Sequence, residues 1–300
     1  MKRRLLSAFA TALVAAACTG GALAVPVEAT DATGARVMLA APAHRIVSLA
    51  PHTTELLFAA GAGASVVGVL DPADWPPEAA RLPRVGDANG LDLERILALK
   101  PDLAVAWPYL APAQTERLRE LGIAVFVSDP RTPEEIATDI ERLGKLTGSD
   151  SIATDAAARF RARLAALVAR ESRKSGAPLA VFYEIWNKPL YTIGGRHLIS
   201  AALDLCGGRN VFASTQLPAL EVSVEAVLAA APAAIVAGTD RAVRPAWLDE
   251  WNRWRDLPAV AHGNLFVVDA DLLHRAGPRF VDGLAQLCAA LDTARENLRH

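Results

Sequence analysis

Residues 150–175 read DSIATDAAARFRARLAALVARESRKS, and the spacing of their apolar side chains predicts one long helix. These side chains recur every three or four positions, as on one face of a helix: Ile152, Ala156, Phe160, Leu164, Leu167 and Val168. Ser149 and Asp150 suit the N-terminal cap, and Gly176 and Pro178 stop the helix. At about 1.5 Å per residue, about 24 residues span roughly 36 Å, the diameter of a small domain. Such a helix is either a rod that joins two lobes or an ordinary surface helix.

The segments on both sides of this helix alternate between short apolar runs and stretches with helical periodicity, which predicts α/β lobes with mostly parallel sheets. The expected strands are 45–49, 65–69, 103–107, 123–127, 179–185, 233–238 and 265–269. The expected helices include 53–60, 92–99, 112–121, 197–206, the Trp-rich 246–254 and a last one from 278. We expect a signal peptide (1–24), a lead-in (25–44), an N-terminal lobe (45–148), the linking helix (149–175) and a C-terminal lobe (176–300).

The two lobes repeat each other. LERILALKPDLAVA (93–106) aligns without gaps with VEAVLAAAPAAIVA (224–237), which places Glu94 against Glu225. A coincidental match would not usually keep the same acid at the same place, so we infer a duplicated lobe. Two such lobes leave a cleft between the carboxyl ends of their strands, where α/β proteins bind ligands.

The composition indicates globular domains. Of the 300 residues, 52% are apolar and 21% are charged, and this length suits two domains or one large one. The net charge of −2 gives no indication of a nucleic-acid partner.

The N-terminus predicts export to the periplasm. Lys-Arg-Arg at 2–4 precedes the apolar run 5–17, and Ala-Leu-Ala at 22–24 is a cleavage site of the A-x-A type. The apolar run is too short to span a bilayer. Lipid anchoring at Cys18 is the alternative, although Ala15 stands where lipoprotein signals usually have Leu.

Two cysteines remain if Cys18 leaves with the signal peptide: Cys206 and Cys288. An even pair in an exported protein suggests a disulfide that would tie the start of the C-terminal lobe to the last helix. Two buried free thiols are the alternative.

Motifs for catalysis are missing. Gly61-Ala62-Gly63 follows a helix, precedes a strand and has Val66 at the last motif position, which is wrong for dinucleotide binding. No phosphate-binding loop, nucleophile elbow or H-E-x-x-H is present. The sequence therefore favours a binding protein over an enzyme, with no catalytic cofactor.

Aromatic side chains gather at or just beyond the ends of predicted strands, where the cleft is expected: Trp75, Trp107, Tyr109, Tyr183 and Trp186. Large flat side chains there can cover a flat ligand, although packing in the lobe cores is an equal alternative. Asp271, His274 and Arg275 follow the strand 265–269 and are expected to face the same cleft. Because His52 and His274 lie near strand ends, they are candidate metal ligands.

Five segments carry a family resemblance: RIVSLAPHTTELLFAAG, DWPPEA, LDLERILALKPDLAVAW, LCGGRNVF and HRAGPRF. In order and spacing, over 45–290, they resemble the vitamin B12 receptors of the Fe/B12 periplasmic-binding family, which serve ABC importers. The resemblance implies a class III periplasmic binding protein-like fold and a transported corrinoid. It implies that Glu94 and Glu225 dock onto arginines of a two-fold permease, which works with a cytoplasmic ATPase. It also supports the Cys206–Cys288 disulfide. We expect a monomer.

The chain departs from this pattern where the receptors carry cobalamin-packing aromatics: it has Pro72, Ala88, Ala219 and Leu272. Trp107, Tyr183, Asp271 and Arg275 do match, so with Trp75 and Trp186 they form the expected ligand-binding set. Cobalamin or a related corrinoid is the leading ligand, and haem or a ferric siderophore stays open. An enzyme acting on a bound tetrapyrrole, or a scavenger without a permease, are further alternatives. For the two glutamates, a local role at the helix N-terminus is the alternative.

Overall fold

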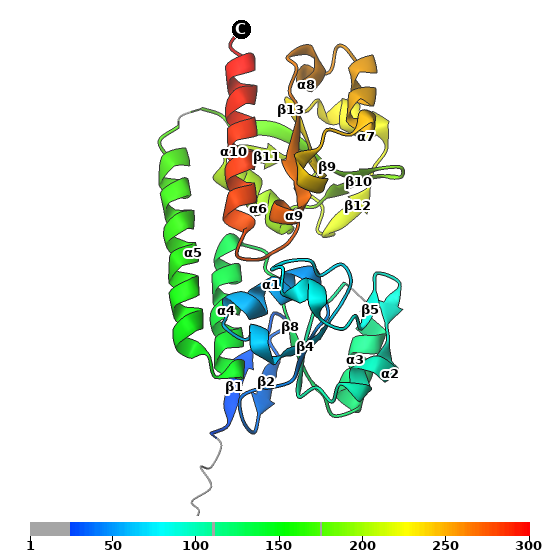
Figure 1. Cartoon of the computed structure of the whole chain (residues 1–300). Helices are drawn as coiled ribbons and strands as arrows, with labels where there is room; N and C mark the ends of the chain where they lie inside the picture. The colour runs from blue at the N-terminus through cyan, green and yellow to red at the C-terminus, as the bar shows by residue number, and fades with distance from the viewer. Residues whose placement is uncertain (1–24, 110–111, 175) are drawn as a thin grey trace, which may run out of the picture.

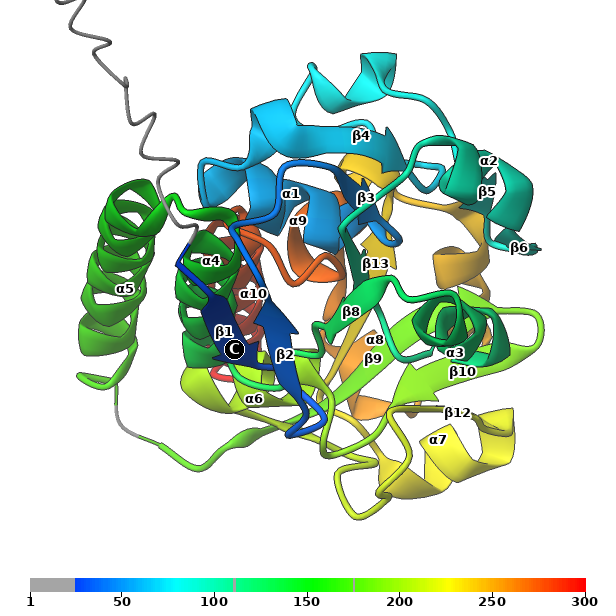
Figure 2. The same cartoon turned by 90° about the horizontal axis from the view of Figure 1, so that it is seen from below.

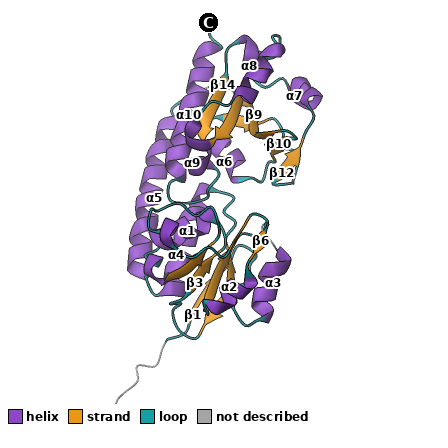
Figure 3. Ribbon diagram, turned by 45° about the vertical axis from the view of Figure 1, so that its right-hand side comes forward, coloured by secondary structure: helices purple, strands orange, loops and turns teal. Residues whose placement is uncertain are grey.

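The computed structural model describes residues 25–109, 112–174 and 176–300, so the expected signal peptide lies outside the described residues. Figure 1 shows two lobes, each built on a β-sheet, with the long helix α5 (Asp150–Glu171) running along one side of both. Figure 3 shows the strands of each lobe flanked by helices. The predicted fold class, two α/β lobes joined by one long helix, is confirmed.

The N-terminal lobe contains a four-stranded parallel sheet in the order β4-β3-β7-β8. Its strands are β3 (Ile46–Ser48), β4 (Val66–Val69), β7 (Leu103–Ala106) and β8 (Ala124–Val127). Its helices are α1 (Pro51–Ala59), α2 (Leu93–Ala98), α3 (Pro112–Glu120) and α4 (Pro133–Thr147). Figure 2 shows α1 and α4 on one side of the sheet and α2 and α3 on the other. Every residue of β7 is buried, because both faces of this inner strand are covered.

The segment expected as an extended lead-in is folded into a hairpin of β1 (Val27–Thr30) and β2 (Arg36–Leu39). The buried Asp31 at its turn accepts hydrogen bonds from the backbone N–H groups of Thr33 (2.8 Å) and Ala35 (3.1 Å). Its second oxygen accepts from Val127 N at 3.2 Å, which ties the hairpin to the end of β8.

The C-terminal lobe has a six-stranded sheet, in which β12-β10-β9-β13-β14 form one path and β11 pairs with β9. The strands are β9 (Leu179–Asn187), β10 (Leu190–Ile193), β11 (Gly208–Asn210), β12 (Ala219–Glu221), β13 (Ala234–Thr239) and β14 (Leu265–Asp269). β9, β13 and β14 are parallel, as expected. The antiparallel β9-β10-β12 edge was not predicted, because β10 and β12 are too short for a clear periodicity.

The helices of this lobe are α6 (Leu198–Leu205), α7 (Val224–Ala230), α8 (Pro258–Ala261), α9 (Ala270–Leu273) and α10 (Phe280–Asn297). The Trp-rich segment Ala246–Arg253 is a 3-10 helix, and Trp251 packs in the core of this lobe. Two small elements, β5 (Gly86–Asp87) and β6 (Gly90–Leu91), pair in the N-terminal lobe.

Helix α5 packs on α4 of one lobe and contacts α10 of the other. Gly144 of α4 allows the closest approach, since a Cβ there would lie 2.2 Å from the Cβ of Ala153. The apolar face is rotated from the predicted one: Ala153, Ala157, Phe160 and Leu167 are buried, whereas Ile152 is exposed. At the far end, Lys174 pairs with Asp292 of α10 at 2.5 Å. The helix therefore braces both lobes.

Cys206, at the end of α6, and Cys288, in α10, form a disulfide with a Cα–Cα distance of 4.8 Å. The predicted pairing is confirmed, and the alternative of two free thiols is wrong. Both cysteines are buried in the same core, so the bond joins two helices that cover one sheet.

Replacing Cys206 and Cys288 together by Ala should lower the free energy of unfolding by about 2–5 kcal/mol, because the bridge closes a long loop of the unfolded chain. The sequence separation of the pair is 82. Urea denaturation of the variant and of the oxidised and reduced wild type measures this effect. The reduced wild type should behave like the variant. Equal midpoints for the oxidised wild type and the variant would contradict a stabilising bridge.

Candidate ligand-binding site

A cavity of about 490 Å³ lies between the lobes. On the N-terminal side, its lining residues follow strands β3, β7 and β8: Ala50, Pro51, His52, Trp107, Tyr109, Asp129, Pro130 and Arg131. On the C-terminal side, they come from β9, the start of α6, the start of β12 and the end of α9: Ile185, Arg196, His197, Leu198, Ile199, Pro218, Ala219, Leu273, His274, Arg275 and Ala276. The carboxyl ends of parallel strands thus meet at the cleft, as the repeat predicts, and the volume suits a small-molecule site.

The N-terminal wall of the cavity is aromatic with a polar end. The ring of Trp107, which is 39% exposed, lies edge to face with Tyr109 (centroids 5.2 Å apart) and His52 (6.1 Å). The Tyr109 hydroxyl donates to Asp129 Oδ2 at 3.3 Å, and Arg131 donates to the same oxygen at 3.0 Å. Asp129 and Arg131 were missed by the sequence reasoning, although Ser-Asp-Pro-Arg directly after a buried strand is a signal for cleft residues.

Tyr183 lies behind the C-terminal wall and not on it. Its side chain is fully buried, and its hydroxyl forms a 2.9 Å hydrogen bond with Nε2 of His274, which does line the cavity. Gly238 makes room for this pair, since a Cβ there would lie 2.2 Å from His274 Nε2. Tyr183 therefore positions His274 and does not itself face the cavity.

Arg275 lines the cavity and is held by three carboxylates, those of Asp74 (2.5 Å), Asp271 (2.8 Å) and Glu55 (3.5 Å). Asp271 is outside the lining and acts on it through Arg275. Arg279 donates to both oxygens of Glu55, at 2.5 and 3.0 Å. Burial raises the pKa of the Glu55 carboxyl, and the two arginines oppose this. Because Glu55 and Asp74 belong to the N-terminal lobe, this network crosses from one lobe to the other.

Besides Tyr183, two more of the predicted aromatic residues are not in the cavity lining. Trp75 lies under the guanidinium of Arg279, which is 4.6 Å from its ring centroid. Trp186 is 58% exposed, and its Nε1 donates to the backbone carbonyl of Lys188 at 3.0 Å.

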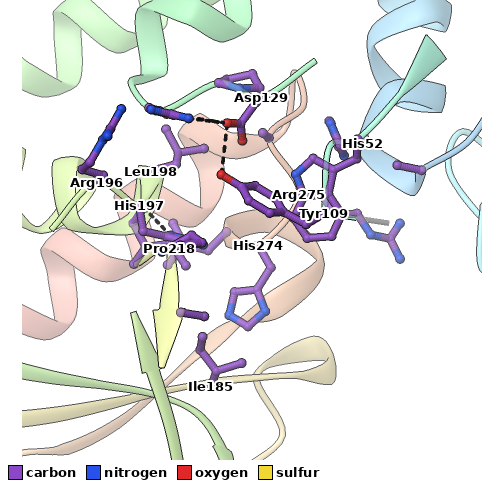
Figure 4. A pocket seen from close by; sticks show the side chains of 18 of the residues that line it. His52, Tyr109, Asp129, Ile185, Arg196, His197, Leu198, Pro218, His274 and Arg275 are labelled. Atoms are coloured by element: carbon purple, nitrogen blue, oxygen red, sulfur yellow. Dashed lines mark hydrogen bonds and ion pairs between the residues drawn. The ribbon is translucent and has the colours of Figure 1, made fainter. Parts of the chain in front are cut away.

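Three histidines line the cavity: His52, His197 and His274 (Figure 4). Burial lowers the pKa of His52 to about 4, although a hydrogen bond with the Ser128 backbone acts in the opposite direction. Nε2 of this ring has no hydrogen-bond partner. His274 uses Nε2 for Tyr183, and its ring is open to the cavity. Within the described residues, no group of three or more His, Cys, Asp or Glu side chains is arranged to hold a metal ion.

Glu94 and Glu225 are exposed residues in the first turns of α2 and α7. Asp92 and Ser223 cap these helices in the same way, by accepting from the backbone N–H three residues later at 2.9 and 3.1 Å. In both Figures 1 and 2, α2 and α7 lie on the side of the molecule away from α5. The repeat therefore places one exposed carboxylate on each lobe.

A family model for periplasmic binding proteins matches residues 46–272 of this chain. The chain belongs to the periplasmic binding protein family. This is a family of substrate-binding proteins and not of enzymes. No helix within the described residues is long and apolar enough to cross a membrane.

Several relatives are similar over most of their length. The vitamin B12-binding protein of Vibrio cholerae is 38% identical over 257 residues, 85% of this chain and 91% of the relative. The crystal structure of the periplasmic vitamin B12 binding protein BtuF of Vibrio cholerae has a TM-score of 0.78 at 36% identity, and the match covers 85% of this chain and 99% of that one. The periplasmic heme-binding protein RhuT from Roseiflexus sp. RS-1 has a TM-score of 0.72 at 27% identity, over 84% and 99% of the two chains.

The buried His52 generates a pH prediction. In the folded protein, its pKa is lowered from 6.5 to about 4. The contribution of the neutral ring to the free energy of unfolding is therefore fully present above pH 6.5 and is lost as the pH falls towards 4. His52→Asn keeps a polar group near Nδ1 but cannot take up this proton. The free energy of unfolding of the variant, relative to wild type, should therefore rise on acidification, as urea titrations at about pH 7.5, 5.5 and 4.5 will measure.

The exposed His262, which is outside the cavity lining, provides the control. His262→Asn should keep the wild-type pH dependence. A difference between wild type and His52→Asn that is constant over the whole range would rule out this role for the ring.

Proposed function

We propose that this protein is the periplasmic substrate-binding protein of an ABC importer, which captures cobalamin or a related corrinoid between its lobes and delivers it to the membrane permease. The observation that carries the proposal is the cavity at the facing carboxyl ends of two duplicated lobes, with Trp107 half-exposed on its wall. The similarity to two vitamin B12-binding proteins supports a corrinoid.

The lining suits a flat ligand with polar substituents. Trp107 and Tyr109 offer ring surface, and Ile185, Pro218 and Leu273 add apolar contacts from the other lobe. Arg275, preset by its carboxylates, can donate to the carbonyl oxygens of corrin amide side chains. Asp271 and Tyr183 support the site from behind. Ala219 lines the cavity where the receptors carry an aromatic residue, so a ligand would meet a wider space there.

A metal carried by the ligand has one candidate axial contact. His52 is preferred over His274 because its Nε2 has no partner, whereas Nε2 of His274 is bonded to Tyr183. Since Nε2 of His52 is buried in the cavity wall, this contact requires the ring to turn towards the ligand. A shift of the aquocobalamin absorption spectrum on binding, lost in His52→Asn, would support this contact. Cyanocobalamin, whose axial position is filled, should not show that shift.

Haem or a ferric siderophore is the second candidate ligand class, which the similarity to the heme-binding protein RhuT supports. An enzyme acting on a bound tetrapyrrole is less favoured, since the chain belongs to a family of substrate-binding proteins. Recovery of a corrinoid unchanged after incubation with the protein would agree with this. The chain is proposed to be a monomer, exported by the signal peptide at 1–24, with lipid anchoring at Cys18 as the alternative.

Glu94 and Glu225 are proposed to dock the receptor on the permease. Neither carboxylate pairs with another described residue, so each lobe offers one free negative charge on the same side of the molecule. A two-fold permease can meet these charges with two basic sites, which would fix the orientation of the complex.

Replacing Trp107 by Ala should weaken cyanocobalamin binding by about tenfold or more, because truncating a central aromatic contact costs on the order of 1–2 kcal/mol or more. Calorimetry of the mature protein with cyanocobalamin, cobinamide and haem measures this effect. Trp186→Ala is the matched control, since Trp186 is exposed outside the cavity, and it should bind as wild type does. Tight haem or siderophore binding without heat from any corrinoid would overturn the ligand assignment.

Exchanging Glu94 and Glu225 for Arg should abolish uptake and permease binding, since both charges on the docking face are reversed. Ligand affinity and folding should change little because both residues lie outside the cavity lining. Glu116→Arg with Glu296→Arg, one exposed acid per lobe, is the control pair. Normal transport by the Glu94/Glu225 variant would show that these glutamates have only a local role at their helix N-termini.

A further inference from the structure

His197 is the N-terminal cap of α6, and its ring is held in one tautomer. Its Nδ1 accepts a hydrogen bond from the backbone N–H of Ile199 at 3.1 Å. A neutral imidazole has one donor and one acceptor nitrogen, so Nε2 must carry the proton. Burial lowers the pKa of His197 to about 4, which keeps the ring neutral in ordinary conditions. Because His197 lines the cavity, its Nε2–H is a fixed hydrogen-bond donor for a ligand.

Arg196 precedes this donor and also lines the cavity. The other two arginines of the lining are neutralised: Arg131 pairs with Asp129 at 3.0 Å, and Arg275 pairs with Asp74 at 2.5 Å. Arg196 is exposed and pairs with no carboxylate among the described residues. It is therefore an uncompensated positive charge at the cavity.

The backbone that carries both side chains is built tightly. Gly194 N donates to Pro218 O at 3.1 Å, and Gly195 N donates to Thr215 O at 3.0 Å. A Cβ on Gly195 would lie 2.1 Å from Ala213 O, so only glycine permits this close approach. The Ser200 hydroxyl donates to Gly194 O at 2.8 Å and ties the loop to the first turn of α6. Arg196 and His197 are thus presented from a rigid loop.

The one acid that acts electrostatically on His197 is Asp129, from the opposite lobe. That carboxylate already accepts hydrogen bonds from Arg131 and Tyr109, so it does not compete for Arg196 or for the imidazole N–H. Figure 4 shows Asp129 between the pair His52 and Arg275 and the end of the cavity lined by Arg196 and His197. This part of the cavity has two donors without a described acceptor.

We infer that Arg196 and His197 form a subsite for an anionic oxygen of the ligand. This inference rests on the proposed function, ligand capture between the lobes. The shared chemistry is an oxyanion that accepts a charge-assisted hydrogen bond from Arg196 and a neutral one from Nε2–H of His197. A complete corrinoid supplies it as the phosphodiester of its nucleotide loop, and haem supplies it as a propionate carboxylate. The protonated Nε2 also excludes His197 as a metal ligand.

The test compares Arg196→Ala and His197→Ser with the wild type, by calorimetry with cyanocobalamin, cobinamide and haem. Serine is a preferred helix cap, so His197→Ser deletes the donor but keeps α6 capped. Each variant should weaken cyanocobalamin binding about tenfold and leave cobinamide binding, which involves no nucleotide phosphodiester, unchanged. Arg209→Ala, an exposed arginine of the same lobe outside the cavity lining, should bind all three probes as wild type does.

The outcomes separate this subsite from the proposed function. If the wild type binds haem but neither corrinoid, loss of haem affinity in both variants would assign the oxyanion to a carboxylate and would overturn the corrinoid assignment while the subsite stands. Wild-type binding of cyanocobalamin by both variants would overturn the subsite and keep the proposed function. Equal losses of affinity for cobinamide and cyanocobalamin would show that Arg196 and His197 only stabilise the cleft and do not bind an oxyanion. A wild-type protein that binds none of the three probes overturns both proposals.

Discussion

The buried carboxylate of Glu55 holds the two lobes in register. It sits in α1 of the N-terminal lobe, and its partners Arg275 and Arg279 come from the loop that leads into α10 of the other lobe. Gly277 of that loop is packed directly on it, since a Cβ there would lie 2.9 Å from Glu55 Oε2. Removing one partner of a buried ion pair leaves a charge without compensation, which costs about 3–5 kcal/mol. The position of Arg275 at the cavity therefore depends on a contact made on the opposite lobe.

One further contact restricts how the lobes can move, and a second one stiffens the C-terminal lobe itself. Helix α5 touches α4 and α10, and the disulfide fixes α10 to α6. α6 begins at the cavity, and α10 follows the Arg275–Arg279 loop. Because the disulfide joins these two helices, they hold the C-terminal wall of the cavity as one rigid unit. We therefore expect ligand entry to depend mainly on side chains and loops at the cavity mouth, such as the half-exposed Trp107.

Much of this architecture could be predicted from local patterns. The period of α5, the duplicated helix–Pro–strand segment and the paired cysteines all carry their information within short stretches. The hairpin at 27–39 was not predicted: Asp31 holds its turn through Thr33 and Ala35, but the contact that places the hairpin on the lobe is with Val127, which is far away in sequence. The same holds for the site: Tyr183 lies inside β9 and is covered by His274, a contact that only the folded sheet creates. The donor role of His197 depends on its ring orientation at a helix start, and periodicity contains no information on it.

The two lobes carry equivalent residues on their outer surface but different residues on their cavity walls. Glu94 and Glu225 occupy equivalent, exposed positions, whereas one cavity wall has Trp107 and Tyr109 and the other has Arg196 and His197. On a permease with two identical halves, the proposed docking charges match equally well after the receptor is turned by half a revolution. The cargo, however, is held one way round. Each delivery would then present it in either of two poses, so the permease entrance would have to accept both.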